Sequence, residues 1–270
     1  MDHRPIGVFD SGLGGLTAVQ ELMRLLPLED IIYFGDTARV PYGNRSPETI
    51  LKFARQDLNF LCSFDLKAIV IACGTVSTTS LSILQKEYHL PIIGVVEPTP
   101  VQAARCTRNG KIGLIATAAS IRSGAYEALV QRENPLAHVF GKACPLFVPL
   151  VENGRFRPGD PVIELVAEEY LQSMKDIGVD TLMLGCTHYP LLSDIISKIM
   201  GPQVTLINSG REAARALKAL LIQRDALAKD GLGDVSYFVS DTIDGFEDMA
   251  SLFLRSNLKG MIQQVDIETY

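Results

Sequence analysis

Short runs of β-branched and apolar residues alternate with longer amphipathic stretches along the chain. The apolar runs predict strands at Ile6–Phe9, Ile31–Phe34, Ala68–Ile71, Ile92–Val96, Lys111–Ile115, His138–Ala143, Thr181–Leu184, Val204–Ile207 and Ser236–Val239. The amphipathic stretches predict helices at Leu16–Leu26, Pro47–Phe64, Ser120–Arg132, Val162–Asp176 and Gly210–Ala228. This alternation is typical of α/β proteins with parallel sheets. The continuous apolar strands indicate sheets that are covered on both faces.

A long internal repeat is the most informative feature of the sequence. Residues 5–12 correspond to 111–118, residues 68–75 to 181–188, and residues 92–98 to 204–209. Cys73 follows Asp10 by 63 residues, and Cys186 follows Thr117 by 69. We therefore predict two similar α/β halves, each with a thiol just beyond the carboxyl end of a strand.

This arrangement predicts a central cleft between two pseudo-symmetric domains with mainly parallel sheets. Ligands of open α/β sheets bind outside the carboxyl ends of the strands. Two halves facing each other would bring Cys73 and Cys186 to one ligand from opposite sides. The alternative is coincidence, because cysteine is often a buried and inert residue.

Composition narrows the class of protein. The chain has 270 residues, of which 47% are hydrophobic, enough for one large or two small domains. We find no apolar run of the roughly 18 residues that a membrane span needs, and no leader pattern, so we expect a cytoplasmic protein without a membrane association. The net charge of −6, without a basic stripe, argues against nucleic acid as a partner.

The five cysteines are widely spaced and include no CxxC pair, which indicates neither a disulfide framework nor a metal site. Cys62, Cys106 and Cys144 lie in contexts that suggest packing roles. Cys73 precedes a segment predicted to begin a helix at Val76–Lys86, and Cys186 precedes one at Leu191–Met200. The oriented amides of a helix start would lower the pKa of a thiol.

Polar residues near these two cysteines are candidates for chemistry. Thr75 and Thr187 can donate hydrogen bonds to a carboxylate, and His188 can assist proton exchange at Cys186. The alternative for His188 is a hydrogen-bonded structural imidazole. Glu97 and Glu152 are further acid–base candidates.

Two loops could also face the cleft. In the segment from Asp10 to Gly15 an acid, Ser11 and a glycine-rich turn precede a helix, and the amides there could bind an anion, although Asp10 or Ser11 could equally be a cap. In the segment from Gly35 to Gly43, which contains Pro41, the backbone of Tyr42 and Gly43 could bind a carboxylate. A plain connecting loop is the alternative.

These motifs resemble the aspartate/glutamate racemase family. The resemblance rests on GVFDSGLGGLT (7–17), YFGDTARVPYG (33–43), the segment around Cys73, IGVVEP (93–98), IGLIATAASIRSGAY (112–126) and LGCTHYPLL (184–192). It extends over most of the chain, and the last fifty residues are the least diagnostic.

The resemblance implies a fold and a set of site residues. It implies a first domain of residues 1–97 plus 208–270, a second of 98–207, and racemisation of glutamate without a cofactor, for bacterial peptidoglycan. Cys73 and Cys186 would be proton donor and acceptor, Cys186 acting on L-glutamate and Cys73 on D-glutamate. The resemblance further implies substrate contacts or catalytic assistance from Asp10, Ser11, Pro41, Tyr42, Gly43, Gly74, Thr75, Thr117, Glu152, Thr187 and His188. Members of the family often form homodimers.

The sequence departs from the family pattern at a few positions. Gly74 stands where the family usually has asparagine, which removes one side-chain donor, and Asn208 and Ser120 replace a common aspartate and threonine. The substrate could therefore be a related amino acid such as aspartate. Two further alternatives are a thiol hydrolase that pairs one cysteine with His188, and a non-catalytic metabolite sensor.

Overall fold

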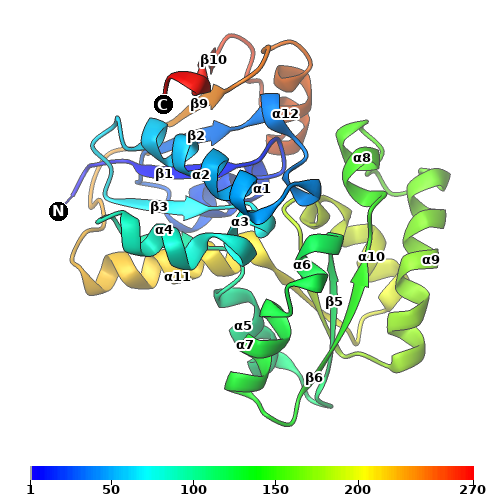
Figure 1. The fold of residues 1–270 in the computed structure, drawn as a ribbon. Coiled ribbons are helices and arrows are strands. Elements are labelled where there is room, and N and C mark those ends of the chain that lie inside the picture. Colours follow the sequence, from blue (N-terminus) through cyan, green and yellow to red (C-terminus); the bar gives the residue numbers. More distant parts are fainter. Residues whose placement is uncertain (1) are drawn as a thin grey trace.

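The structure is a computed structural model that describes residues 2–270. Within that range the chain forms a six-stranded sheet with the order β10-β9-β2-β1-β3-β4 and a four-stranded sheet with the order β6-β5-β7-β8. The strand pairs are parallel in both sheets. In Figure 1 the first sheet occupies the upper left and the second the lower right. The predicted α/β class with mainly parallel sheets is therefore confirmed.

The strands of the first sheet are β1 (Ile6–Asp10), β2 (Ile31–Gly35), β3 (Ala68–Ile71), β4 (Ile92–Gly94), β9 (Val235–Val239) and β10 (Ile262–Gln264). Those of the second sheet are β5 (Lys111–Ala116), β6 (His138–Ala143), β7 (Thr181–Gly185) and β8 (Thr205–Asn208). The α-helices are α1 (Leu16–Leu25), α2 (Pro47–Leu61), α3 (Gly74–Thr79), α4 (Leu81–Glu87), α5 (Pro98–Cys106), α6 (Ala118–Arg122), α7 (Ala125–Glu133), α8 (Phe147–Glu152), α9 (Pro161–Ile177), α10 (Ser193–Met200), α11 (Ser209–Gln223) and α12 (Phe246–Leu254). Short 3-10 turns are η1 (Thr37–Arg39), η2 (Tyr42–Asn44), η3 (Tyr189–Leu192) and η4 (Ile267–Thr269).

The internal repeat of the sequence is also a repeat of topology. The order β2-β1-β3-β4 in the first sheet matches β6-β5-β7-β8 in the second, strand for strand. The strands that carry the repeated motifs, β1, β3 and β4, thus correspond to β5, β7 and β8. β9 and β10 extend the first sheet beyond β2. This distribution of strands supports the proposed division into residues 1–97 plus 208–270 and residues 98–207.

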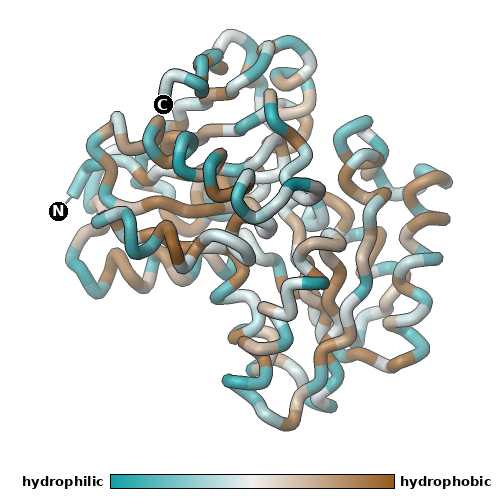
Figure 2. The backbone as a smooth tube through the Cα atoms, in the orientation of Figure 1, coloured by the Kyte–Doolittle hydropathy of each residue, from teal (hydrophilic) through white to brown (hydrophobic). Residues whose placement is uncertain are grey.

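The core lies on both faces of the sheets, as the apolar strands indicate. Every residue of β1, β2, β3 and β7 is buried. Figure 2 shows this as hydrophobic strands inside a shell of helices with mixed colouring. α1 and α11 pack against each other on the first sheet, where α11 follows directly from β8 of the second.

One predicted helix is broken in the structure. The stretch Ser120–Arg132 becomes the end of α6 and most of α7, because Gly124 between them has φ +64°. A positive φ is unfavourable for residues with a Cβ and ends a helix. Thr117 caps the start of α6 by accepting a hydrogen bond from Ser120 N.

Candidate active site

Cys73 lies two residues beyond β3 and is the N-cap residue of α3. Its Sγ is 3.4 Å from Oγ of Ser11, which follows the neighbouring strand β1. Parallel neighbours end at the same edge of a sheet, so the pairing of β1 with β3 brings Asp10, Ser11 and Cys73 together. Cys73 is buried, with 5% of its surface exposed.

The expected lowering of the pKa at Cys73 is wrong. Burial is the largest influence, and with the nearby charge of Asp10 it raises the pKa of Cys73 to about 12. Hydrogen bonds from Ser11 and from the backbone at Val76 act in the opposite direction and are outweighed. Cys73 lies at a helix start, as predicted. The free-energy cost of removing a thiolate from water, however, exceeds the stabilisation that the amides of a short helix provide.

Asp10 serves the glycine-rich turn as well as the site. Its Oδ2 accepts hydrogen bonds from Gly12 N at 3.2 Å and Gly15 N at 2.9 Å. Burial raises the pKa of Asp10, and the charge of His188 and these backbone donors lower it. Asp10 thus stabilises the glycine-rich turn, which was the structural role considered as an alternative for it. Its carboxylate is also close enough to His188, which follows β7 of the second sheet, to feel the charge of that side chain.

Cys186 lies directly after β7, at the position in the second sheet that Cys73 occupies in the first. Its Sγ is 3.8 Å from Nδ1 of His188, whose Nε2 is 2.9 Å from Oε1 of Glu152. His188 is 7% exposed, and Glu152 is the last residue of α8. A thiol, an imidazole and a carboxylate in series can exchange a proton along one line.

The charge state of His188 follows from its two partners. Burial lowers the pKa of His188, but hydrogen bonds and charges of Cys186 and Glu152 outweigh burial and raise that pKa to about 10. Both partners thus favour the protonated, imidazolium form of His188. An adjacent imidazolium stabilises a thiolate by charge and by hydrogen bonding.

The two halves touch directly beside the thiols. Oγ1 of Thr17 on α1 donates a 2.7 Å hydrogen bond to the carbonyl of Thr187. A Cβ on Gly14 would overlap the side chains of Thr187 and His188, so only glycine fits there. Likewise, a Cβ on Gly74 would be 3.2 Å from the carbonyl oxygen of Gly185. Neither Gly14 nor Thr17 was singled out from the sequence, although both belong to the motif at residues 7–17.

Both thiols lie near one phenol, that of Tyr126 on α7. Burial raises the pKa of Tyr126 most, followed by the charges of Cys186 and then Cys73. The hydroxyl is fully buried and has no hydrogen-bond partner among the described residues. Sequence reasoning did not single out Tyr126; its place at the end of the motif at residues 112–126 was the available signal.

The loop after β2 meets the Cys73 side of the site. The turn η2 packs against α3 and α6, and a Cβ on Gly43 would be 3.9 Å from Oγ1 of Thr75. Pro41, after a cis peptide bond, is exposed, whereas the side chain of Tyr42 is 1% exposed and packs within the first domain. The Tyr42 phenol is therefore not available to a ligand, whereas the backbone at Tyr42 and Gly43 can contact one.

The threonines occupy positions at the ends of strands and starts of helices. Thr75 is buried in the first turn of α3, and Thr187 is buried between Cys186 and His188. Thr117 Oγ1 donates to Ser120 Oγ at 3.1 Å, and that oxygen would be 3.9 Å from a Cβ on Gly74. Thr117 and Ser120 thus lie at the start of α6, which follows β5 of the second sheet, but they are close to the segment that follows Cys73.

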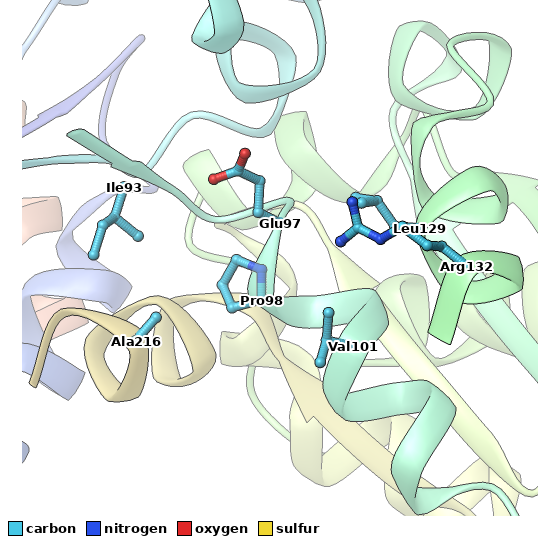
Figure 3. A pocket seen from close by; sticks show the side chains of 7 residues that line it. All are labelled: Ile93, Glu97, Pro98, Val101, Leu129, Arg132 and Ala216. Atoms are coloured by element: carbon cyan, nitrogen blue, oxygen red, sulfur yellow. The ribbon is translucent and has the colours of Figure 1, made fainter. Parts of the chain in front are cut away.

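Glu97 does not belong to this cluster. It is exposed and lines a pocket of about 330 Å³ at the junction of β4, α5, α7 and α11, together with Ile93, Pro98, Val101, Leu129, Arg132 and Ala216. Figure 3 shows Glu97 between Ile93 of the first sheet and Arg132 of α7. Of the two acids proposed as auxiliaries, only Glu152 contacts a residue beside a thiol.

The remaining cysteines differ from one another. Cys144 is buried, as expected for packing, Cys106 is partly buried, and Cys62 is exposed, so Cys62 is not a core residue. Among the described residues no group of three or more His, Cys, Asp or Glu is arranged to hold a metal ion. No helix within residues 2–270 is long and apolar enough to span a membrane.

Comparison with known proteins agrees with this geometry. The sequence model of Asp/Glu/Hydantoin racemase matches residues 15–217. A glutamate racemase of Geobacter metallireducens is 45% identical over 99% of this chain and 98% of its own length. A crystal structure of glutamate racemase from Francisella tularensis in complex with D-glutamate superposes with a TM-score of 0.90 at 39% identity, covering both chains fully. A glutamate racemase of Bacillus anthracis superposes with a TM-score of 0.93 at 37% identity over 98% of each chain. The chain therefore belongs to the Asp/Glu/hydantoin racemase family.

Proposed function

We propose that this chain, an amino-acid racemase, interconverts L- and D-glutamate with Cys73 and Cys186 as the two proton-transfer groups. One observation supports this most strongly. The two thiols occupy equivalent places in the repeated sheets, and the segments that carry them meet at Gly74 and Gly185. The names of the relatives, glutamate racemases at up to 45% identity in the alignments above, support glutamate as the substrate.

The proposed reaction needs one thiolate and one thiol. The thiolate on one side removes the α-hydrogen of the amino acid, and the thiol on the other side gives its proton to the opposite face of the same carbon. The protonation states of the two sulfurs are then exchanged, which prepares the site for the reverse reaction. Two opposed groups achieve inversion without any movement of a base around the substrate.

The structure supports unequal starting states for the two sulfurs. Cys73 has a pKa raised to about 12 and holds its proton at neutral pH, whereas Cys186 lies beside the imidazolium of His188. We infer that Cys186 is the thiolate and Cys73 the thiol when L-glutamate binds. Glu152 holds the imidazolium through Nε2.

The α-hydrogen of an amino acid is only very weakly acidic, so charge that develops on the substrate carboxylate needs fixed donors in a dry site. We assign this role to the hydroxyls of Ser11, Thr75, Thr117 and Thr187. The backbone N–H groups of Tyr42 and Gly43, which follow Pro41, are proposed to bind a substrate carboxylate equally in the ground state and in the transition state. We propose that Asp10 contacts the substrate amine. We propose that these groups suffice without an added cofactor.

The Cys186–His188–Glu152 series also has the order of groups that a thiol hydrolase uses. In that alternative Cys73 has no catalytic role, and the repeat of strand order between the two sheets has no explanation. An acyl-enzyme adduct on Cys186 in mass spectra would support it.

We also propose a cytoplasmic location, a homodimer, and a role in supplying D-glutamate for peptidoglycan. Analytical ultracentrifugation tests the dimer, and restoration of growth in a bacterium that depends on external D-glutamate tests the cellular role.

The proposal is tested by adding purified protein to L-glutamate, or separately to L-aspartate, without a cofactor and following optical rotation. We expect racemisation of glutamate and at least tenfold slower conversion of aspartate. Faster conversion of aspartate would contradict the assigned substrate, and activity only with an added cofactor would contradict the mechanism.

A further inference from the structure

A buried polar network lies behind the loop that carries Tyr42 and Gly43, and the proposed proton transfers do not use it. Its centre is Arg39, whose side chain is 9% exposed. Arg39 Nε donates to Asp36 Oδ2 at 2.7 Å, Nη2 to Asp57 Oδ1 at 2.8 Å and Nη1 to Gln56 Oε1 at 2.6 Å. All three nitrogens of the guanidinium therefore have protein partners.

Tyr42 joins the same network from the other end of the loop. Its hydroxyl contacts Asp36 Oδ2 and lies 2.9 Å from Asp57 Oδ2. The Tyr42 ring packs against Phe53 of α2 with centroids 5.5 Å apart, and the Arg39 guanidinium lies 4.3 Å from the centroid of the Phe53 ring. The side chain of Tyr42 is thus an anchor directed into the first domain.

The network also connects the loop to distant parts of the chain. Ser240 Oγ, just after β9, donates to Asp36 Oδ1 at 2.7 Å and accepts from Ala38 N at 2.9 Å. Glu268 in η4 reaches Arg39 Nη1 at 3.5 Å. The loop is therefore fixed from α2 on one side and from the last strands of the first sheet on the other.

Such a network is a weak source of folding stability. Buried ion pairs contribute little net stability compared with packed apolar side chains, because both ions lose their hydration. What the network does provide is direction, since several hydrogen bonds fix Asp36 at one end of the loop and Tyr42 at the other. Backbone donors held in place before the ligand arrives bind it at a lower entropic cost.

We propose that Asp36, Arg39, Tyr42 and Asp57 are positioning residues that hold the backbone of residues 41–43 in the orientation that binds the substrate carboxylate. This inference rests on the proposed function, in which that backbone contacts glutamate. The four side chains act through the loop and take no part in proton transfer. Their loss therefore weakens substrate binding and leaves the chemical step largely intact.

The direct test is Tyr42→Phe, which keeps the ring packing and removes only the hydroxyl. The hydroxyl contacts two carboxylates, and hydrogen bonds to charged groups are stronger than those between neutral groups. We expect KM for both enantiomers of glutamate to rise about tenfold or more, with a much smaller change in kcat. That pattern is the signature of lost uniform binding.

The matched control is Tyr88→Phe. Tyr88 also donates its hydroxyl to α2, to Asn59 Oδ1 at 2.8 Å and to the Arg55 carbonyl at 3.2 Å, but it lies outside the network. We expect its KM and kcat to equal those of the unchanged enzyme. Arg39→Lys, which keeps the charge but not the three-way hydrogen bonding, should raise KM in the same way as Tyr42→Phe.

The outcomes separate positioning from simple stability. A Tyr42→Phe enzyme with unchanged KM overturns the inference, whether or not its melting temperature falls. A fall in kcat at unchanged KM overturns it as well. If the unchanged protein does not racemise glutamate, the proposed function fails and takes this inference with it, whereas unchanged KM in an active enzyme removes only the inference.

Discussion

The backbone of Gly74 lies against the carbonyl of Gly185, so close that a Cβ on Gly74 would be 3.2 Å from that oxygen. Each glycine is next to one of the two cysteines. The contact between the segment after Cys73 and the segment before Cys186 therefore depends in part on the absence of a side chain at position 74.

We expect Gly74→Ala to impair catalysis more than folding. The added methyl group needs the two segments to separate by a few tenths of an ångström, and small misplacements of reacting groups have large effects on rate. We predict a loss in kcat/KM of about tenfold, with circular dichroism unchanged. Full activity in Gly74→Ala would show that the two segments are not in contact during turnover.

The charge of His188 is testable by titration. Its pKa, raised to about 10, depends on Cys186 and Glu152 after burial, which acts in the opposite direction. NMR of the imidazole should show His188 still protonated at pH 8. In Glu152→Gln the pKa of His188 should fall towards 6.5. A native titration midpoint near 6.5 would contradict the assigned imidazolium.

The same shift has a consequence for stability. The folded protein binds the His188 proton more tightly than the unfolded chain does, so this contribution is complete below about pH 6.5 and is lost as pH rises towards 10. The difference in unfolding free energy between the native protein and Glu152→Gln should therefore be greatest in mild acid and shrink above pH 8. A difference that grows with pH would reverse the sign that we assign.

Tyr126 offers a test of the unpartnered hydroxyl. A buried polar group without a partner costs roughly 1–3 kcal/mol, so Tyr126→Phe should stabilise the protein by about 1 kcal/mol in urea unfolding. Tyr189→Phe is the control, because its hydroxyl donates to the Cys144 carbonyl at 3.0 Å and its loss should be destabilising. Equal effects of the two changes would mean that the Tyr126 hydroxyl has a partner in solution.

Within the first domain, a buried ion pair connects residues near the start of the chain to the segment after α11. Lys67 Nζ contacts Glu29 and donates to the carbonyls of Asp2 at 2.6 Å and Ala226 at 3.0 Å. The Lys67 and Glu29 side chains are 1% and 2% exposed. Lys67→Met leaves a buried carboxylate unpaired and should cost about 3–5 kcal/mol in unfolding free energy.

The double change Lys67→Met with Glu29→Leu removes both charges and should recover much of that loss. A double variant as unstable as Lys67→Met alone would show that packing, and not the unpaired charge, is the cause. Activity per folded molecule should stay unchanged in both.

The sequence predicted the fold well where the pattern was strong. Ala68–Ile71 and His138–Ala143 agree with β3 and β6 residue for residue, and the two similar halves that the repeat predicted share the strand order β2-β1-β3-β4 and β6-β5-β7-β8. β10 was missed because only Ile262 of its three residues is buried, which leaves no periodic pattern. The break at Gly124 was missed because a glycine within an amphipathic stretch does not reveal its φ.

The sequence pointed to candidate residues that the structure brings into contact, but it did not predict their electrostatics. The sequence placed Cys73, Cys186, His188 and Glu152 beside a cleft, and the structure brings His188 into contact with both Cys186 and Glu152. It could not predict the raised pKa of Cys73, which depends on how completely Asp10, Ser11 and their neighbours exclude water. The close approach of Gly14 to Thr187 likewise depends on how the two halves pack.

The two-thiol mechanism is tested most directly by racemisation of L-glutamate in D₂O by the native enzyme, Cys73→Ser and Cys186→Ser. The two-thiol mechanism predicts that the native enzyme places deuterium in the D-product, while early recovered L-substrate keeps its α-hydrogen. Each single variant should lose at least a thousandfold in racemisation, an order of magnitude consistent with the removal of an essential base. Substantial racemisation by either variant would contradict the assignment of Cys73 and Cys186 as the two bases.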